Sequence, residues 1–130
     1  MANIKNLQMW NTICNDPRIS ITKSMFGLKT KVIYKKSGST VKAQTIEYSP
    51  ADGDRLKQIL SSPVEQWPKS ISGFHPKGIV NGNYKLEVCK SEDNEFLALQ
   101  LLQFSRMNYE PVLDIIFLEG EQTKAFAPLL

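Results

Sequence analysis

Apolar residues near the start of the chain recur at helical spacing. They occupy positions 4, 7, 10, 13 and 14, and most positions between them are polar. Asn3 belongs to the residue types that accept a hydrogen bond at a helix start, whereas the stretch Asn15-Asp16-Pro17 interrupts the pattern. The spacing therefore predicts a first amphipathic helix that begins after Asn3 and ends before Pro17.

After Pro17 the pattern changes to alternation of apolar and polar residues. Ile19 and Ile21 share one face of an extended segment, and a second run extends from Lys29 to Lys36. One face of this second run carries Thr30, Val32 and Tyr34, and the other carries Lys29, Lys31, Ile33 and Lys35. A Ser-Gly-Ser turn at 37–39 leads into residues 40–48, which are rich in β-branched side chains. We predict a β hairpin here.

A second helix is predicted from Ser49 to about Ser61. Ser49 supplies a cap, Pro50 takes the first helical position, and Asp52 lies near the positive end of the helix dipole. Residues 63–83 then carry several prolines and glycines without periodicity, which predicts an irregular loop. Its available anchors are Trp67, Phe74 and Ile71.

The last third of the chain reads as a β-meander. Residues 84–89 alternate, a polar turn follows, and residues 112–118 form an apolar strand. Residues 96–104 are ambiguous, because Leu, Ala and Gln favour helices; we prefer a strand, since the short turn before it favours a hairpin. Gly120 is expected to turn residues 123–127 back as a short final strand.

These elements predict one α+β domain over residues 1–130, with a mostly antiparallel sheet and two short helices. The sheet combines a hairpin with the C-terminal β-meander. Hydrophobic residues make up 42% and charged residues 22% of the chain, as in ordinary globular proteins. No apolar stretch is long enough to span a membrane, and no signal peptide is visible, so we expect a soluble cytoplasmic protein without membrane contact.

No recognisable catalytic, metal or cofactor motif occurs in the sequence. Cys14, Cys89 and His75 are far apart in sequence, whereas structural metal sites usually contain a close pair of ligands. We expect both cysteines to be reduced and not catalytic, and we expect no cofactor. The acidic residues at 92, 93 and 95 fit a solvated turn better than a pair of acid-base groups.

Charge is distributed unevenly along the chain. The first 50 residues carry 8 lysines and arginines against 2 acidic residues, a net charge of +6, and the remainder carries −3. Clustered lysines attract phosphates, so the sequence offers a candidate nucleic-acid surface. Its strand residues are Lys23, Lys29, Lys31, Lys35, Lys36 and Lys42. Exposed strands also use lysines to prevent aggregation, and this simpler explanation has the better odds.

A second candidate feature is the loop that follows Trp67. It interleaves aromatic and basic residues, the combination with which single-strand binders stack bases and contact phosphates. Its candidate residues are Trp67, Lys69, Phe74 and Lys77. Aromatic residues in a long loop more often pin the loop to the core, and that explanation is again the stronger one.

The leading functional hypothesis is a non-catalytic binding module for single-stranded nucleic acid. The alternative is a protein-interaction or assembly subunit, for example a component of a phage or mobile element, that docks a protein partner or self-associates through strand edges and an apolar C-terminus (residues 125–130). A third hypothesis is an enzyme with His75 as acid or base, for which no partner residue is identifiable.

Overall fold

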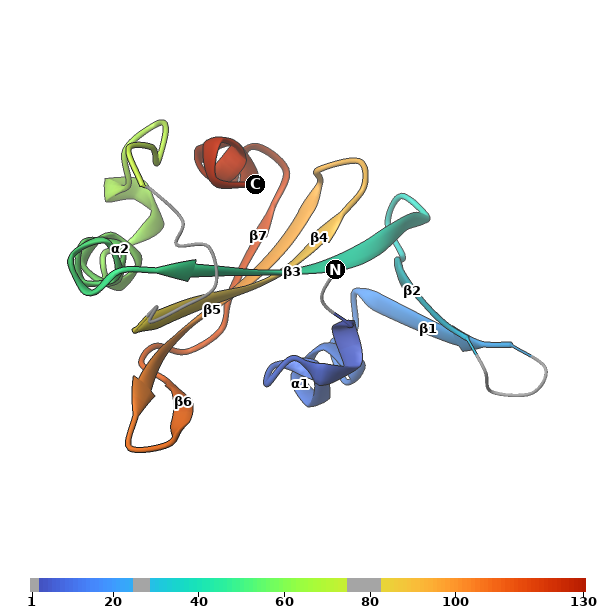
Figure 1. Ribbon diagram of the computed structural model, residues 1–130. Coiled ribbons are helices and arrows are strands. Elements are labelled where there is room, and N and C mark those ends of the chain that lie inside the picture. Colours follow the sequence, from blue (N-terminus) through green and yellow to red (C-terminus); the bar gives the residue numbers. More distant parts are fainter. Residues whose placement is uncertain (1–2, 25–28, 75–82) are drawn as a thin grey trace.

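The structure is a computed structural model that describes residues 3–24, 29–74 and 83–130. Twelve elements follow one another in the described part, with 3-10 helices labelled η (Figure 1). They are η1 (Ile4–Asn6), α1 (Trp10–Cys14), β1 (Ile19–Lys23), β2 (Thr30–Tyr34), β3 (Ser39–Tyr48), α2 (Pro50–Ser61), η2 (Val64–Gln66), β4 (Tyr84–Ser91), β5 (Phe96–Ser105), β6 (Asn108–Pro111), β7 (Ile116–Glu119) and η3 (Gly120–Leu129). The α+β class with a mostly antiparallel sheet is confirmed.

The strands form a sheet in which sequence neighbours are also spatial neighbours. The order is β1-β2-β3-β4-β5-β6, and every pairing is antiparallel. β7 also pairs with β5, along the half of that strand that β6 leaves free. α2 and the following loop lie between β3 and β4 in sequence, yet these two strands pair along eight residues. The longest strands, β3 and β5, therefore flank β4 at the centre of the sheet.

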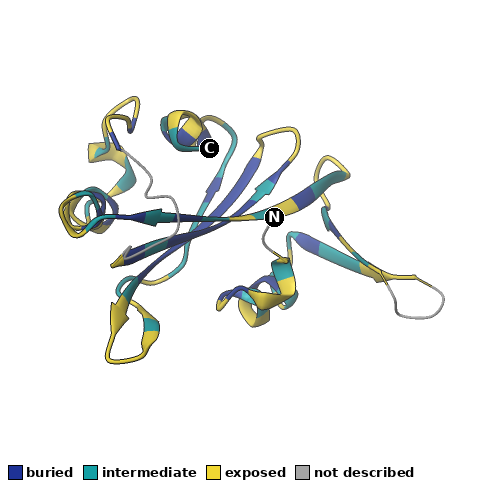
Figure 2. Cartoon of the chain, in the orientation of Figure 1, coloured by how far each residue is buried: buried dark blue, intermediate teal, exposed yellow. Residues whose placement is uncertain are grey.

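The central strands bury both of their faces. One face packs against α2, the loop and η3, through buried residues that include Leu56, Ile71 and Phe126. The other face packs against the N-terminal segment and the β1–β2 hairpin, through residues that include Ile13 and Val32. Buried positions concentrate on the central strands in Figure 2. The sheet therefore separates two apolar clusters.

Burial on both faces explains why β5 is almost uniformly apolar. Strands covered on both sides need no polar alternation, so a Leu-rich run suits them as well as it suits a helix. The strand begins at a turn in which the Ser91 hydroxyl oxygen accepts the N–H groups of Glu95 (3.2 Å) and Phe96 (2.9 Å). Our preference for a strand over a helix in this segment is confirmed.

The predicted first helix is wrong in its continuity. The chain forms η1, where Asn3 accepts the N–H of Lys5 as expected (3.0 Å), and then a separate helix α1. The buried carboxylate of Glu87 on β4 accepts the N–H groups of Gln8 (2.9 Å) and Met9 (3.3 Å), immediately before α1. Burial raises the pKa of Glu87, and these hydrogen bonds oppose that rise. Glu87 on β4 thus takes up the N–H groups of Gln8 and Met9, and the helix is interrupted at these residues.

The predicted second helix is confirmed. α2 begins at Pro50, and the Ser49 hydroxyl accepts the N–H of Asp52 (3.3 Å). Its end at Ser61 also agrees. Each of these signals acts within one helical turn, which is why the sequence alone locates this helix well.

The prediction for the C-terminal third needs two corrections. Residues 112–118 are not one strand: β6 precedes them, a bend follows, and only β7 pairs along the first half of β5. Residues 123–127 do not form a final strand, because they belong to η3. Phe126 within η3 is fully buried and packs edge-on against Trp67, with 5.3 Å between ring centroids. Burial of this ring, rather than strand pairing, therefore accounts for the final segment.

Candidate binding groove

A groove opens where β2 and β3 separate. The two strands pair only at Ile33–Thr40 and Tyr34–Ser39, next to their connecting turn. Beyond this point the β1–β2 hairpin turns away from β3, so the strands diverge in a V (Figure 1). The resulting hollow has a volume of about 670 Å³ and is bordered by β1, β2, β3 and the N-terminal residues Asn3 and Ile4. We call it the lysine groove.

Four of the six predicted strand lysines line this groove. They are Lys23, Lys29, Lys31 and Lys42, and all four are exposed. No aspartate or glutamate is among its described lining residues, whereas four hydroxyl side chains are: Thr22, Ser24, Thr30 and Thr40. Glu92 lies 3.9 Å from the Lys42 ammonium, but both side chains are about 60% exposed, so water screens this pair. The groove therefore presents a positive surface rich in hydrogen-bond donors.

The two faces of the sheet differ at the groove. Lys29 and Lys31 share the alternating face of Ile33, which pairs with Thr40; Lys42 lies on that face too, two residues along β3. The opposite face carries Val32 and Val41, which are 2% and 4% exposed and belong to the cluster around α1. The face of Lys31 and Lys42 is therefore cationic, whereas the opposite face is apolar at Val32 and Val41 and carries Lys23 at the end of β1.

Three lysines depart from the predicted lysine face. Lys23 pairs with Thr30 across the hairpin, so it lies on the face of Val32 rather than with Lys31. Lys35 and Lys36 lie in the turn after β2, outside the groove lining. The pairing register, which alternation within one strand does not specify, places Lys23, whereas the end of β2 at Tyr34 places Lys35 and Lys36 in the turn.

Backbone groups also face the groove. Lys35 donates its N–H to the carbonyl oxygen of Arg18 on the β1 side (2.9 Å), so Thr30 and Val32 direct their backbone groups the other way. On β3, the carbonyl oxygen of Thr40 accepts from Glu92 on the β4 side (2.9 Å). By the same alternation, the backbone groups of residues 41 and 43 face β2. The ladder ends at Ile33–Thr40, a pair held by the bonds of the residues that flank it, so the backbone groups without a described strand partner begin in full at Ala43 on β3 and Thr30 on β2.

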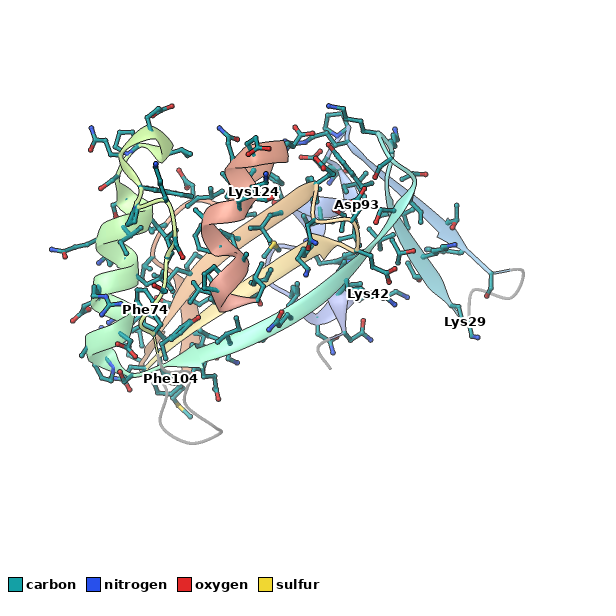
Figure 3. All side chains as sticks on the ribbon, turned by 90° about the horizontal axis from the view of Figure 1, so that it is seen from above. Lys29, Lys42, Phe74, Asp93, Phe104 and Lys124 are labelled. Carbon is teal, nitrogen blue, oxygen red and sulfur yellow. The ribbon has the colours of Figure 1, made fainter. Side chains whose placement is uncertain are left out.

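The aromatic rings of the second candidate feature pack into the protein. Trp67 donates its indole N–H to the carbonyl oxygen of Ser62 (2.9 Å) and packs against Phe126. Phe74 is 8% exposed, and the Arg55 guanidinium lies 4.0 Å from its ring centroid. Phe74 lies far from the lysine groove: Figure 3 shows Phe74 and Lys29 at opposite ends of the molecule. These rings therefore anchor the loop.

The remaining loop residues add little to the groove. Lys69 is exposed on the loop and is not among the groove-lining residues. Lys77 and His75 lie outside the described residues, so the structure places neither the predicted phosphate contact nor the hypothetical acid or base. The predicted lysine and loop features are therefore not brought together as one surface by the described residues.

A second hollow of about 640 Å³ lies between the β4–β5 turn and η3. Its lining mixes charges, with Lys90 and Lys124 among three carboxylates. Hydrogen bonds from Ser37 and Ser91 hold the pKa of Asp93 below its usual value. This carboxylate therefore stabilises the β4–β5 turn. The mixture gives this hollow no preference for a ligand of one charge.

Other chemistry has little support among the described residues. Burial raises the pKa of Cys89 to about 12, which keeps this thiol protonated and unreactive. Within residues 3–24, 29–74 and 83–130, no group of three potential metal ligands occurs. In the same part of the chain, the structure contains no helix with the length and apolar character needed to cross a membrane.

Neither the shape of the groove nor two of its components, the hydroxyl side chains and the strand-edge backbone groups, were predicted from the sequence. Neither the four hydroxyl residues nor the backbone groups at the strand edges stood out, because each becomes relevant only when β2 and β3 separate. The alternating pattern did identify Lys29 and Lys31. Comparison of the chain with protein-family models, curated proteins and solved structures gave no match.

Proposed function

We propose that this chain is a non-catalytic binding module that holds an extended, negatively charged polymer in the lysine groove. The observation that carries the proposal is the lining itself: four lysines from three neighbouring segments and no acidic residue among those described. Clustered ammonium groups raise the local potential, and a polymer gains from several such contacts at once. A groove bordered by the edges of two extended strands suits an extended chain better than a compact small molecule.

Single-stranded nucleic acid is the first candidate polymer. Lysine ammonium groups neutralise phosphates, and the hydroxyls of Thr22 and Thr40 are suited to donate hydrogen bonds to phosphate oxygens. No aromatic side chain is among the described lining residues, so bases would gain no stacking there. Binding of this kind would depend on the phosphate backbone and show little sequence preference.

An acidic polypeptide is the second candidate, and a separate observation favours it. The edges of β2 and β3 direct backbone donors and acceptors into the groove beyond Ile33–Thr40. Strand addition at such an edge is a recurrent mode of peptide recognition. This candidate corresponds to the protein-interaction hypothesis, with the site in the groove rather than at the C-terminus.

The test is fluorescence-anisotropy binding of a labelled oligothymidine and a labelled glutamate-rich peptide at about 50 and about 200 mM salt. We expect at least one probe to bind and its affinity to fall with salt. The double variant Lys31→Glu/Lys42→Glu should remove this binding. A matched control, Lys57→Glu/Lys124→Glu, makes the same change of charge at exposed positions outside the groove and should retain it.

Two results would contradict the proposal. If neither probe binds at low salt, the lysines form a solvated surface without a polyanion ligand. If both double variants weaken binding equally, net charge rather than the groove controls the interaction. Circular dichroism of each variant establishes that the fold is intact, which is expected because all four substituted lysines are exposed.

A further inference from the structure

We propose that the occupant of the lysine groove is an extended segment of another protein, with acidic and apolar residues in alternation, that adds as a strand between the diverging edges of β2 and β3. The inference rests on the proposed function, because it assigns the chemical class of the polymer that the groove holds. Three properties of the described residues carry it: the backbone groups, the two faces and the lining.

The backbone groups match what an extended polypeptide needs. Thr30 and Val32 face the groove from β2, while Val41 and Ala43 face it from β3. Thr30 and Ala43 each offer one N–H and one carbonyl oxygen in the alternation that a strand partner uses, whereas Val32 and Val41 flank the last pair of the ladder. A polypeptide supplies both donors and acceptors in return. Phosphate oxygens supply acceptors only, so the carbonyl oxygens at these edges would repel them.

The two faces of the groove specify the side-chain pattern of the guest. Lys31 and Lys42 lie on one face, and successive side chains of a guest strand alternate between faces. Acidic residues on that face would lie beside these ammonium groups. The other face is bordered by Val32, Val41 and the partly buried Ile4, where apolar side chains extend an existing cluster. The complementary sequence is therefore acidic and aliphatic in turn.

The site also explains why the guest should enter from the open end of the V. Val32 and Val41 are nearly fully buried, next to the last pairing at Ile33–Thr40. Thr30 and Ala43, farther from the turn, are partly exposed. The free edges therefore become more accessible with distance from the turn.

The experiment compares three labelled probes on the full chain. They are a peptide of alternating glutamate and valine, the same peptide with N-methyl groups on alternate residues, and an oligothymidine of matched charge. N-methylation removes the N–H donors of one edge while keeping composition and charge. We expect the first peptide to bind and the methylated peptide to bind about tenfold more weakly or worse, the loss of one or two hydrogen bonds.

A backbone variant tests the same contact from the protein side. Ala43→Pro removes an N–H that faces the groove while leaving the β3–β4 ladder its hydrogen bonds, and proline is tolerated at strand edges. We expect intact circular dichroism and about tenfold weaker peptide binding or worse. If this variant does not fold, amide hydrogen exchange of the unmodified protein replaces it: the peptide should protect the amides of Thr30 and Ala43.

The outcomes separate this inference from the proposed function. Equal binding of the plain and methylated peptides, or no added amide protection, would overturn strand addition. Binding of oligothymidine but not of the peptide would overturn the polypeptide assignment and leave the polyanion function supported. Absence of binding by all three probes would overturn both.

Discussion

Gly53 shows how one residue adapts α2 to the sheet beneath it. A Cβ atom at this position would lie 1.9 Å from Cδ2 of Tyr84 on β4. At a solvent-exposed position inside a helix, alanine stabilises the helix by about 1 kcal/mol relative to glycine. Here the added methyl group must displace the helix or the ring, so we expect Gly53→Ala to destabilise the fold by about 1–3 kcal/mol. Urea unfolding measures the difference.

A matched control for Gly53→Ala is available in the same helix. Gln58 is exposed, so Gln58→Ala should change the free energy of unfolding by less than about 0.5 kcal/mol. Increased stability of Gly53→Ala would show that helical propensity dominates over the close approach to Tyr84.

The contribution of Glu119 to the free energy of unfolding depends on pH. Its carboxylate accepts a hydrogen bond from the Tyr34 hydroxyl and another from Arg18 (3.2 Å), and these interactions lower its pKa from the ordinary value of 4.5. A lowered pKa means that the stabilisation is complete above pH 4.5 and is lost as the pH falls through the lowered value. Glu119→Gln should therefore reduce stability most near neutral pH.

The measurement is urea unfolding of the natural protein and Glu119→Gln between neutral and acidic pH. We expect the difference in unfolding free energy between the two proteins to shrink below pH 4.5. A difference that stays constant over this range would show that the carboxylate charge contributes nothing.

At the scale of elements, η3 completes a core rather than forming a tail. Phe126 is fully buried against Trp67, and Leu129 and Leu130 pack partly onto the same cluster. Phe126→Ala should therefore destabilise the protein by about 3–5 kcal/mol. Thermal or urea unfolding tests this, with exposed Ala127→Ser as the control. A negligible effect of Phe126→Ala would support the earlier hypothesis of an exposed docking tail.

The predicted helices and strands were right where local signals decide and wrong where distant segments decide. The second helix was located from Ser49, Pro50 and Asp52 because their effects are local. β6 was missed because two separate segments share the outer edge of β5. η3 was missed because burial of Phe126, rather than strand pairing, accounts for the final segment. The site lysines on β2 followed from alternation, whereas their proximity to Lys42 required the pairing register.

At the scale of the whole molecule, β4 and β5 contribute to both apolar clusters. Trp10 packs against the cluster on the α1 side, and Trp67 packs against the cluster on the α2 side. Because the two clusters share these strands, we expect them to unfold together. Single-tryptophan variants, Trp10→Phe and Trp67→Phe, should show coincident urea transitions by fluorescence. Two separate midpoints would show that the clusters unfold independently.

The amino-acid sequence by itself determined the α+β class, the second helix, the turn that joins β2 to β3 and the concentration of lysines in the first half of the chain. These depend on periodicity, capping and charge, which act among neighbours in sequence. Only the tertiary structure decided that Glu87 interrupts the first helix, that Trp67 and Phe74 anchor the loop, and that Lys31 and Lys42 border one groove. Each of these depends on which distant segments are packed together, because burial and strand register are properties of the assembled chain.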